Sequence, residues 1–311
     1  MRLPAESPAA WTVRHRATLF PDHHATPDQP TTDQLAGGDG PAYVLRTTED
    51  LITGALDRAL DDLTAGGAPL SAAGMQLAGS YAGLVSWWLG VALLGADAAL
   101  VVSPSAVSYW CHPDGYPDAL EIADPIGAVV PPGHRWSDHP GVGVAPPRQV
   151  AEAAAHAAIV AVTPVVDRLH ELTRAGRVGL WHEVADAFAG AAAYQQDVRI
   201  TAPDLQTIDD ALALPGAPWR RRPGLHLHRA PDGPVCVLHK AGCCLAYTAP
   251  TSLDTEIDED HRAFEAAFPP ESGRPDYCVS CKFRSLEETT RMQLWWRARE
   301  AAVTSSGSPT P

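Results

Sequence analysis

The stretch "SAAGMQLAGSYAGLVSWWLGVALLGA", residues 71–96, decides the fold class that this sequence predicts. It contains no charged residue and is long enough to cross a bilayer. Five glycines and several polar residues interrupt it, and no lysine or arginine lies close on either side, unlike the usual flanks of a membrane span. We therefore expect a helix buried in the core of a globular protein, and no stable membrane span.

Helical patterns continue on both sides of this stretch. Helices are predicted over 45–64, 148–173, 178–195 and 284–302. In the first, Leu51, Leu56, Leu60 and Leu63 recur at helical spacing, and Thr48 with Asp50 offers an N-terminal signal. In the second, Val162, Val165, Leu169 and Leu172 form one apolar stripe, and Pro164 predicts a kink.

Short strands are predicted between and after the helices. The segments 98–110 and 118–130 carry β-branched residues and bracket the turn-rich "CHPDGYP", which indicates a β-hairpin. A second hairpin is predicted over 225–240, turning at "APDGP". The proline- and glycine-rich segment 126–147 is predicted to be a loop. The fold class is therefore α+β, a largely helical body with short antiparallel strands.

Four parts of the chain are expected. They are an irregular N-terminal arm (1–40), a body of helices and a β-hairpin (41–200), a C-terminal cluster-binding module (201–303) and a disordered tail (304–311). The N-terminal residues lack the apolar core of a secretory signal, so we expect a cytoplasmic protein with reduced thiols.

Composition excludes some function classes. Across 311 residues, 45% are hydrophobic and the net charge is −14, which indicates a globular protein without a nucleic-acid partner. No glycine-rich phosphate loop or dinucleotide fingerprint is present, so binding of NAD(P)H or a flavin by those means is not expected. Basic residues concentrate in 220–240 and 281–300. These stretches are either a solvated basic face or a docking surface for an acidic partner.

The cysteines carry the strongest functional signal. Four of the six form two tight clusters, Cys243 with Cys244 and Cys278 with Cys281. In reducing surroundings this pattern suits zinc, an iron–sulfur cluster or a dithiol couple. Adjacent cysteine side chains diverge, and a two-iron cluster accommodates them more readily than one tetrahedral ion does, so the spacing favours a cluster over zinc.

Other residues of the same region are weaker candidates. Cys236 and Cys111 are single and are expected in the core. His239, His226 and His228 could serve as ligands in a mixed site, but strand histidines of this kind are more often packed or at the surface. Lys240, Lys282 and the amides near Ala246 and Ser280 are candidates for tuning a reduction potential.

A Cys-Cys pair followed by Cys-x-x-Cys near the C-terminus resembles the FhuF-type ferric-siderophore reductases. The segments "SYAGLVSWWLGVALLGADAALVVSPSAVSYW", "RVGLWHEVADAFAGA" and "AGCCLAYTAP" are similar to the family as well, and the likeness spans roughly residues 45–285. The resemblance implies a [2Fe–2S] cluster held by Cys243, Cys244, Cys278 and Cys281. It also implies one-electron reduction of a ferric siderophore. Because no dinucleotide fingerprint is present, the electrons would come from another protein, such as an acidic ferredoxin that the basic stretches suit, or from a small reductant.

The chain departs from that family in one place. Residues 245–277 separate the cysteine pairs, where the family has a short gap. Within them, 251–273 are strongly acidic, and we expect this segment to loop out beside the cluster with a short helix near 257–267. Its charge would favour neutral or cationic chelates, hence hydroxamate-type siderophores over catecholate-type ones.

Two other classes of function stay open from the sequence. The first is a non-enzymatic protein in which the four cysteines hold a structural zinc or iron–sulfur site. The second is a dithiol oxidoreductase that uses Cys278 and Cys281, although the thioredoxin-like motif belongs early in a βαβ unit.

Overall fold

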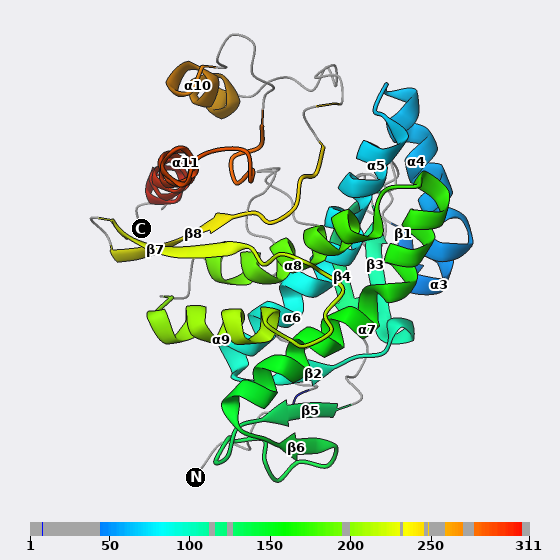
Figure 1. The fold of residues 1–311 in the computed structure, drawn as a ribbon, viewed down its shortest axis with the longest axis vertical. Helices are drawn as coiled ribbons and strands as arrows, with labels where there is room; N and C mark the ends of the chain where they lie inside the picture. The colour runs from blue at the N-terminus through cyan, green and yellow to red at the C-terminus, as the bar shows by residue number, and fades with distance from the viewer. Residues whose placement is uncertain are drawn as a thin grey trace.

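A computed structural model describes the fold of most of the chain. The residues described are Pro8, 44–111, 116–122, 127–194, 200–230, 233–245, Thr248, 259–269 and 277–306. The predicted arm over 1–40 lies outside them apart from Pro8. The predicted α+β class is confirmed, since helices make up most of the fold and the strands form small sheets (Figure 1).

A continuous helix runs through the middle of the body. It consists of α5 (Leu70–Leu77), a π-helical stretch η2 (Ala78–Ala82) and α6 (Gly83–Ala96). Trp88 and Leu89 are almost wholly buried, which confirms the prediction of a core helix. This helix and α7 (Pro147–Thr173) are long and apolar enough to span a membrane, but 78% and 56% of their most apolar windows are buried in the fold.

Helix α8 (Arg177–Ala193) packs along α6 at close range. A Cβ added at Gly90 would lie 2.7 Å from the Phe188 carbonyl oxygen and 2.8 Å from the Ala191 Cβ. Only glycine therefore fits at this crossing. Helix α7 packs beside both, continues through Pro164 and buries Val162 and Leu169 as predicted.

The helix predicted over 45–64 begins later than expected. Val44–Thr47 form strand β1, followed by α3 (Thr48–Asp50), a π-helical stretch η1 (Leu51–Ala55) and α4 (Leu56–Ala65). Thr47 caps the helix through a reciprocal bond with Asp50. The prediction was wrong for the first residues because their backbone pairs with β3, a partner distant in sequence.

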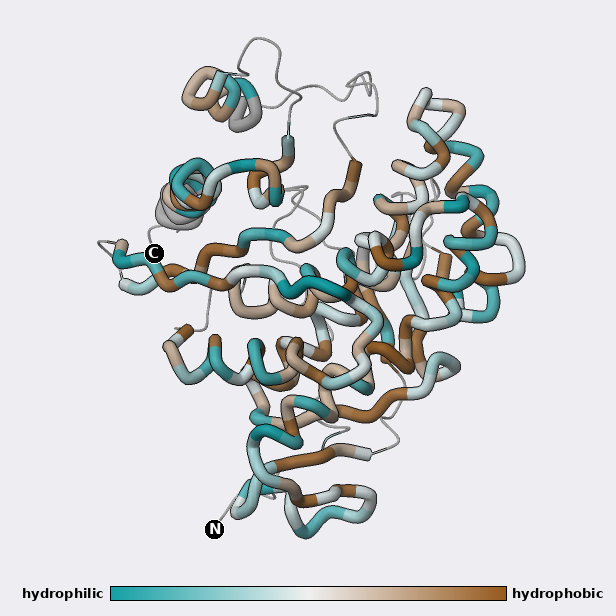
Figure 2. The backbone as a smooth tube through the Cα atoms, in the orientation of Figure 1, coloured by the Kyte–Doolittle hydropathy of each residue, from teal (hydrophilic) through white to brown (hydrophobic). Residues whose placement is uncertain are grey.

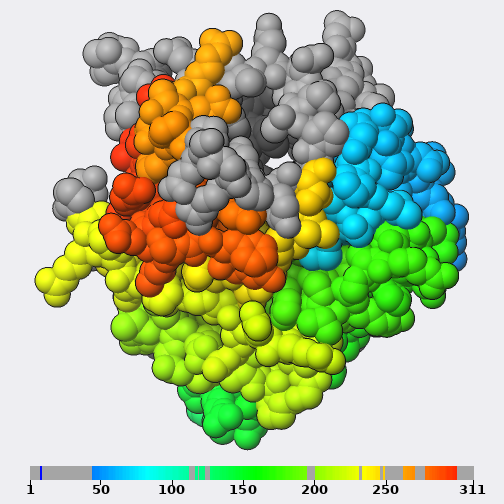
Figure 3. All heavy atoms as spheres, turned by 45° about the horizontal axis from the view of Figure 1, so that its top comes forward, coloured from blue at the N-terminus to red at the C-terminus, as the bar shows by residue number. Residues whose placement is uncertain are grey.

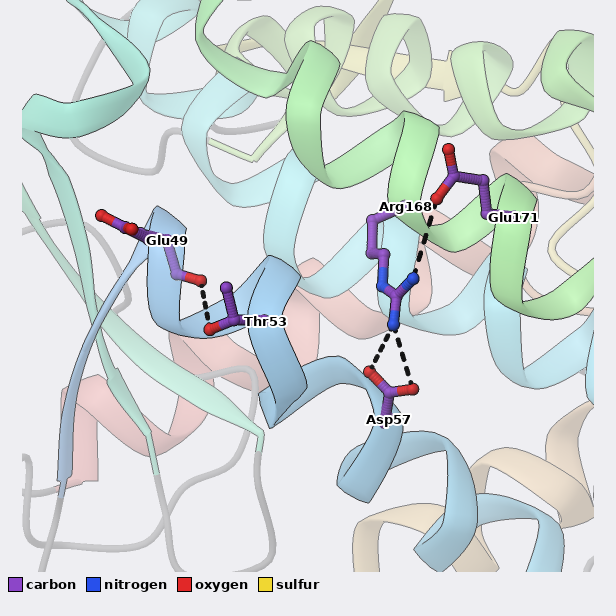
Figure 4. Close-up of polar contacts among 5 residues, drawn as sticks. All are labelled: Glu49, Thr53, Asp57, Arg168 and Glu171. Carbon is purple, nitrogen blue, oxygen red and sulfur yellow. Dashed lines mark hydrogen bonds and ion pairs between the residues drawn. The ribbon is translucent and has the colours of Figure 1, made fainter.

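An ion pair joins α4 to α7. Arg168 Nη2 lies 3.0 Å from Oδ2 and 3.2 Å from Oδ1 of Asp57, and Arg168 Nη1 lies 3.7 Å from Glu171 Oε2 (Figure 4). In the same view, the Thr53 hydroxyl donates to the Glu49 carbonyl oxygen, 2.8 Å away within one helical turn. Both contacts lie at the edge of the body, while its apolar core lies between the helices.

The body also carries two three-stranded sheets. They contain β1, β3 (Val107–Cys111) and β4 (Pro117–Ile122) in one sheet, and β2 (Ala99–Val101), β5 (Gly127–Val130) and β6 (Val142–Val144) in the other. The antiparallel pairing of β3 with β4 confirms the predicted hairpin. A 3₁₀ turn, η3 (Pro104–Ala106), separates β2 from β3. Strand β3 therefore lies in the first sheet, while β2 pairs with β5 in the second.

The prediction of a loop over 126–147 was wrong at both of its ends. Strand β5 pairs antiparallel with β2 and parallel with β6. Short valine-containing runs without proline lie at both ends of this segment. They form strands because they pair with partners that local composition does not reveal. In Figure 2, β2 and β5 are largely hydrophobic, whereas α4 and α9 (Ala202–Leu212) carry hydrophilic residues on their outer turns.

The C-terminal part adds a hairpin and two helices. Strands β7 (Gly224–Ala230) and β8 (Gly233–His239) pair as predicted, and α11 (Leu286–Ser306) follows the second cysteine pair. Helix α11 ends beyond the predicted 302, and 307–311 lie outside the described residues. Gln293 of α11 binds the backbone of Leu238 in β8, with bonds of 3.0 and 2.5 Å. Figure 3 shows this C-terminal segment, orange to red, lying over the yellow hairpin.

The predicted short helix of the acidic segment is present as α10 (Glu259–Ala267). It does not stand apart from the fold, because its aromatic side chains pack on α11. Phe264 stacks on Trp296 with ring centroids 5.1 Å apart and contacts Trp295 at 5.4 Å. Residues 251–258 and 270–276 lie outside the described part of the chain.

Candidate metal centre

The two cysteine segments meet above helix α8. The first follows β8, and the second precedes α11. The backbone N–H of Lys240 donates to the carbonyl oxygen of Ser280, 2.9 Å away. This bond links the two segments directly, although 33 residues separate Cys244 from Cys278.

Hydrogen bonds link three of the four predicted thiols, those of Cys244, Cys278 and Cys281. The Cys244 thiol donates to Cys278 Sγ at 4.0 Å, and the thiols of Cys278 and Cys281 are also hydrogen-bonded. Cys243 lies near enough to Cys281 to influence its ionisation. All are free thiols; Cys281 is buried, and the other three are half-buried.

The distance between Cys244 and Cys278 suits two ligands of one metal ion. Thiolates about 2.3 Å from a tetrahedral metal stand about 3.8 Å apart, close to the 4.0 Å between these sulfurs. Among the described residues, no group of three or more His, Cys, Asp or Glu side chains is already arranged to hold a metal ion. The donor set fits a cluster in chemistry, with four soft thiols from two segments.

Hydrogen bonds within the thiol group set the proton affinities. The bond from Cys244 lowers the pKa of Cys278, but the bond with Cys281 and burial outweigh it and raise that pKa to about 11. The bond with Cys278 lowers the pKa of Cys281, against the effect of burial. Cys281 is thus the thiol of this pair that loses its proton more readily.

Asp186 of α8 anchors the first cysteine segment. Its carboxylate accepts the N–H of Ala241 at 2.7 Å and the N–H of Gly242 at 2.9 Å, immediately before Cys243. Burial raises the pKa of Asp186 to about 7, while Lys240 and the two backbone bonds oppose the rise. A Cβ at Gly242 would lie 2.9 Å from both Asp186 Oδ2 and the Cβ of His182, so glycine permits this approach.

A buried ion pair lies beside the thiols. Lys240 Nζ stands 3.1 Å from Glu183 Oε2, with Glu183 only 3% exposed. Burial opposes the charge of Lys240, but Glu183, Asp186 and the Cys278 thiol outweigh it and hold the pKa of Lys240 well above its usual value. The lysine therefore keeps a positive charge next to the sulfurs, which favours thiolates.

The second cysteine segment is held by a different set of bonds. Arg284 Nε donates to the carbonyl oxygens of Tyr277 and Cys278, each 3.1 Å away, and its Nη2 also donates to Tyr277. The Tyr194 side chain, at the end of α8, is hydrogen-bonded to the Ser280 side chain. Helix α8 thus contacts both halves of the motif.

The remaining predicted residues have structural positions. Cys236 and Cys111 are buried in the core as expected, and burial raises the pKa of Cys236 to about 12. His226 and His228 are exposed on β7, and His239 Nε2 lies 3.2 Å from the Arg284 carbonyl oxygen. Ala246 lies outside the described residues.

Sequence reasoning missed the contribution of α8. His182, Glu183 and Asp186 stand out as polar residues in an otherwise apolar helix, and the two carboxylates share one face three residues apart. That pattern signals a buried polar contact, but it does not name the partner. The partners lie more than fifty residues later, in the Lys240–Gly242 segment.

No family model matches the chain, and neither a curated protein nor a solved structure matches it.

Proposed function

We propose that this protein is a cytoplasmic ferric-siderophore reductase with a [2Fe–2S] cluster on Cys243, Cys244, Cys278 and Cys281. The observation that carries the proposal is the contact between the two distant cysteine segments, with the Cys244 and Cys278 sulfurs 4.0 Å apart. When bound, such a cluster supplies a one-electron carrier.

The proposed reaction is a simple electron transfer. A reduced donor protein loses one electron, and the Fe(III) of the bound siderophore gains it and leaves as Fe(II). Hard oxygen donors hold Fe(III) more firmly than Fe(II), so reduction releases the metal without breaking a bond of the chelator.

The chain's own residues position and tune the site. Asp186 fixes the backbone before Cys243, and Arg284 fixes the carbonyls around Cys278. Lys240 places a cation beside the sulfurs, partly balanced by Glu183. None of these roles requires a proton transfer to the substrate, as expected for a site that transfers electrons.

The first experiment tests the metal. Protein purified anaerobically from iron-replete cells should contain about two irons and two sulfides per chain, with a red-brown colour. Cys243→Ser, Cys244→Ser, Cys278→Ser and Cys281→Ser should each lose or alter the visible spectrum, because a serine oxygen is a poor replacement for a thiolate. Cys236→Ser is the matched control and should keep the spectrum.

Two results would contradict the proposal. One tightly held zinc without sulfide would indicate a structural site in a non-enzymatic protein. A protein that holds the cluster but reduces no ferric siderophore would contradict the activity and leave the cluster assignment intact. Reduction is measured by trapping the released Fe(II) with a coloured chelator.

The acidic segment 251–273 is proposed to favour hydroxamate-type ferric siderophores. Glu265 is exposed on α10, which packs on α11, the helix that follows the second cysteine pair. Replacing 251–273 with a Gly/Ser linker should raise the reduction rate of an anionic chelate relative to a cationic one. Phe264→Ala is the control, since it weakens α10 packing and keeps every charge; an unchanged ratio in the linker variant would exclude selection by this segment.

A further inference from the structure

Two apolar side chains are exposed directly beside the cysteine site. Phe283 is 48% exposed and Leu286 is 39% exposed, two and five residues after the buried Cys281. The Phe283 ring is fixed from two sides, with the Tyr277 ring centroid 5.4 Å away and Lys282 Nζ 5.1 Å from its own centroid. A large ring held in this way at the surface costs little further ordering when a partner covers it.

A second segment brings further cations to α8. The backbone N–H of Arg221 donates to His182 Nε2 at 3.2 Å. Burial lowers the pKa of His182, and the charges of Lys282 and Arg221 lower it further. Arg221 thus contacts a histidine of α8 on which the charge of Lys282 also acts, although the two cations are far apart in sequence.

The neighbouring arginines differ in what they contact. Arg222 pairs with Asp209 at 2.9 Å. Arg220 and Arg221 are exposed, and in the part of the chain that the structure describes neither they nor Lys282 make an ion pair with a carboxylate. Their charges are thus available to a partner, and we name Arg220, Arg221, Lys282, Phe283 and Leu286 together the donor face.

We propose that an acidic electron-donor protein docks on the donor face, an inference that rests on the proposed function. An apolar centre bordered by cations has the anatomy of a protein–protein interface. The chain as a whole has a net charge of −14, which would repel an acidic protein. A local group of cations beside Cys281 would orient an acidic protein, because its negative charge is attracted to this face while the chain as a whole repels it.

The docked donor would lie next to the cysteine site. Lys282 and Phe283 follow Cys281 directly in the chain, so a protein covering them comes close to the thiols without displacing them. One electron would pass from the reduced donor to the site, and the oxidised donor would then dissociate.

Binding of an acidic plant-type ferredoxin, measured by titration calorimetry on the metal-containing protein, tests the proposal. Affinity should fall between about 0.01 M and about 0.15 M salt, as the screening length shortens from about 30 Å to about 8 Å. Arg221→Glu and Lys282→Glu should each weaken binding about fivefold or more at low salt and flatten the salt dependence. Phe283→Ala should weaken binding at both salt concentrations.

Arg148→Glu is the matched control for charge reversal. Arg148 is exposed in the first turn of α7, and its reversal should change ferredoxin affinity by less than about twofold. Arg220→Glu repeats the test on a residue that does not adjoin a cysteine, and the visible spectrum of each variant reports whether the metal is retained. Reversal variants that keep their metal and bind ferredoxin as tightly as the wild type would overturn the proposal.

A small chelate is the competing occupant. If Arg221→Glu weakens binding of an anionic ferric tricatecholate complex and leaves ferredoxin binding unchanged, the face binds substrate and the donor proposal is wrong. The ferredoxin titration needs no turnover. Loss of ferredoxin binding in the variants can therefore be observed even if the metal assay contradicts the reductase proposal, and the reverse holds as well.

Discussion

Helix α8 contacts two glycines in two different ways. At Gly90 it meets α6 backbone to backbone, with the Phe188 carbonyl and the Ala191 methyl group closing the space. At Gly242 it meets the cysteine segment through the side chains of His182, Glu183 and Asp186. The first contact is apolar and tightly packed, whereas the second depends on a few directed bonds. Disruption of the first contact should therefore unfold the helical body, and disruption of the second should release the metal that we propose the cysteines hold.

The largest effect is expected at the apolar contact. Gly90→Leu forces a side chain into space that backbone atoms already fill, and we expect a loss of more than about 3 kcal/mol, enough to prevent folding. Far-UV circular dichroism and yield of soluble protein would measure it. Gly176→Ala is the control, because nothing lies within 4 Å of its added Cβ; equal losses in both variants would contradict close packing as the cause.

The next effect is expected at the polar contact. Asp186→Ala leaves the N–H groups of Ala241 and Gly242 without their acceptor in a buried place, at a cost of about 3 kcal/mol. We expect loss of metal with helical content retained, measured by metal analysis and circular dichroism on the same sample. Asp209→Ala, which removes an exposed carboxylate on α9, should keep the metal. Full metal content in Asp186→Ala would show that the thiols need no such anchor.

A smaller effect is expected where α11 joins the hairpin. Gln293→Leu removes both side-chain bonds to the backbone of Leu238, and we expect a loss of about 1–2 kcal/mol. Chemical denaturation of the metal-containing protein measures it. Gln206→Leu removes an exposed bond to Asp210 on α9 and should change stability by less than about 0.5 kcal/mol. Similar values for the two glutamines would argue that α11 is held by its apolar contacts instead.

The smallest effect is expected at the edge of the body. Asp57 and Arg168 form an ion pair whose side chains are 42% and 30% exposed. A double-mutant cycle with Asp57→Asn and Arg168→Gln should give a coupling energy below about 1 kcal/mol, and salt should reduce it. A coupling above about 2 kcal/mol would mean that this pair supports the body far more than its exposure suggests.

The sequence predicted the elements whose signals are local. The buried helix around Trp88 and the helix carrying Val162 follow from apolar runs and helical spacing, and both are confirmed. Strand β6 was missed because proline and glycine dominate its surroundings, and β5 lies in the predicted strand 118–130 but pairs with β2 and β6, partners that no local window reveals. The first helix was predicted to start too early for the same reason, since Val44–Thr47 form a strand only through their pairing with β3.

The candidate site divides in a similar way. Cysteine spacing alone predicted Cys243, Cys244, Cys278 and Cys281 as a group, and in the structure hydrogen bonds link the thiols of Cys244, Cys278 and Cys281. Spacing could not identify Asp186, because hydrogen bonding to Gly242 depends on how α8 crosses the end of β8. The expectation that the acidic segment simply loops out was incomplete for a related reason, since Phe264 meets Trp296 only in the folded chain.

The π-helical stretch η2 sets the rotational phase of the central helix. In a π-helix each hydrogen bond spans five residues instead of four, so one turn holds about one residue more than an α-helical turn does. The residues after Ala82 are therefore rotated relative to where an uninterrupted α-helix would place them. Each residue of an α-helix turns the chain by about 100°. If residues 78–82 adopted regular α-helix with every residue kept, α6 would turn by about that angle. Gly90 would then no longer face Phe188, and the helix would present bulkier neighbours to α8. The wider turn of this one stretch therefore determines which side of α6 meets the helix that supports the cysteines.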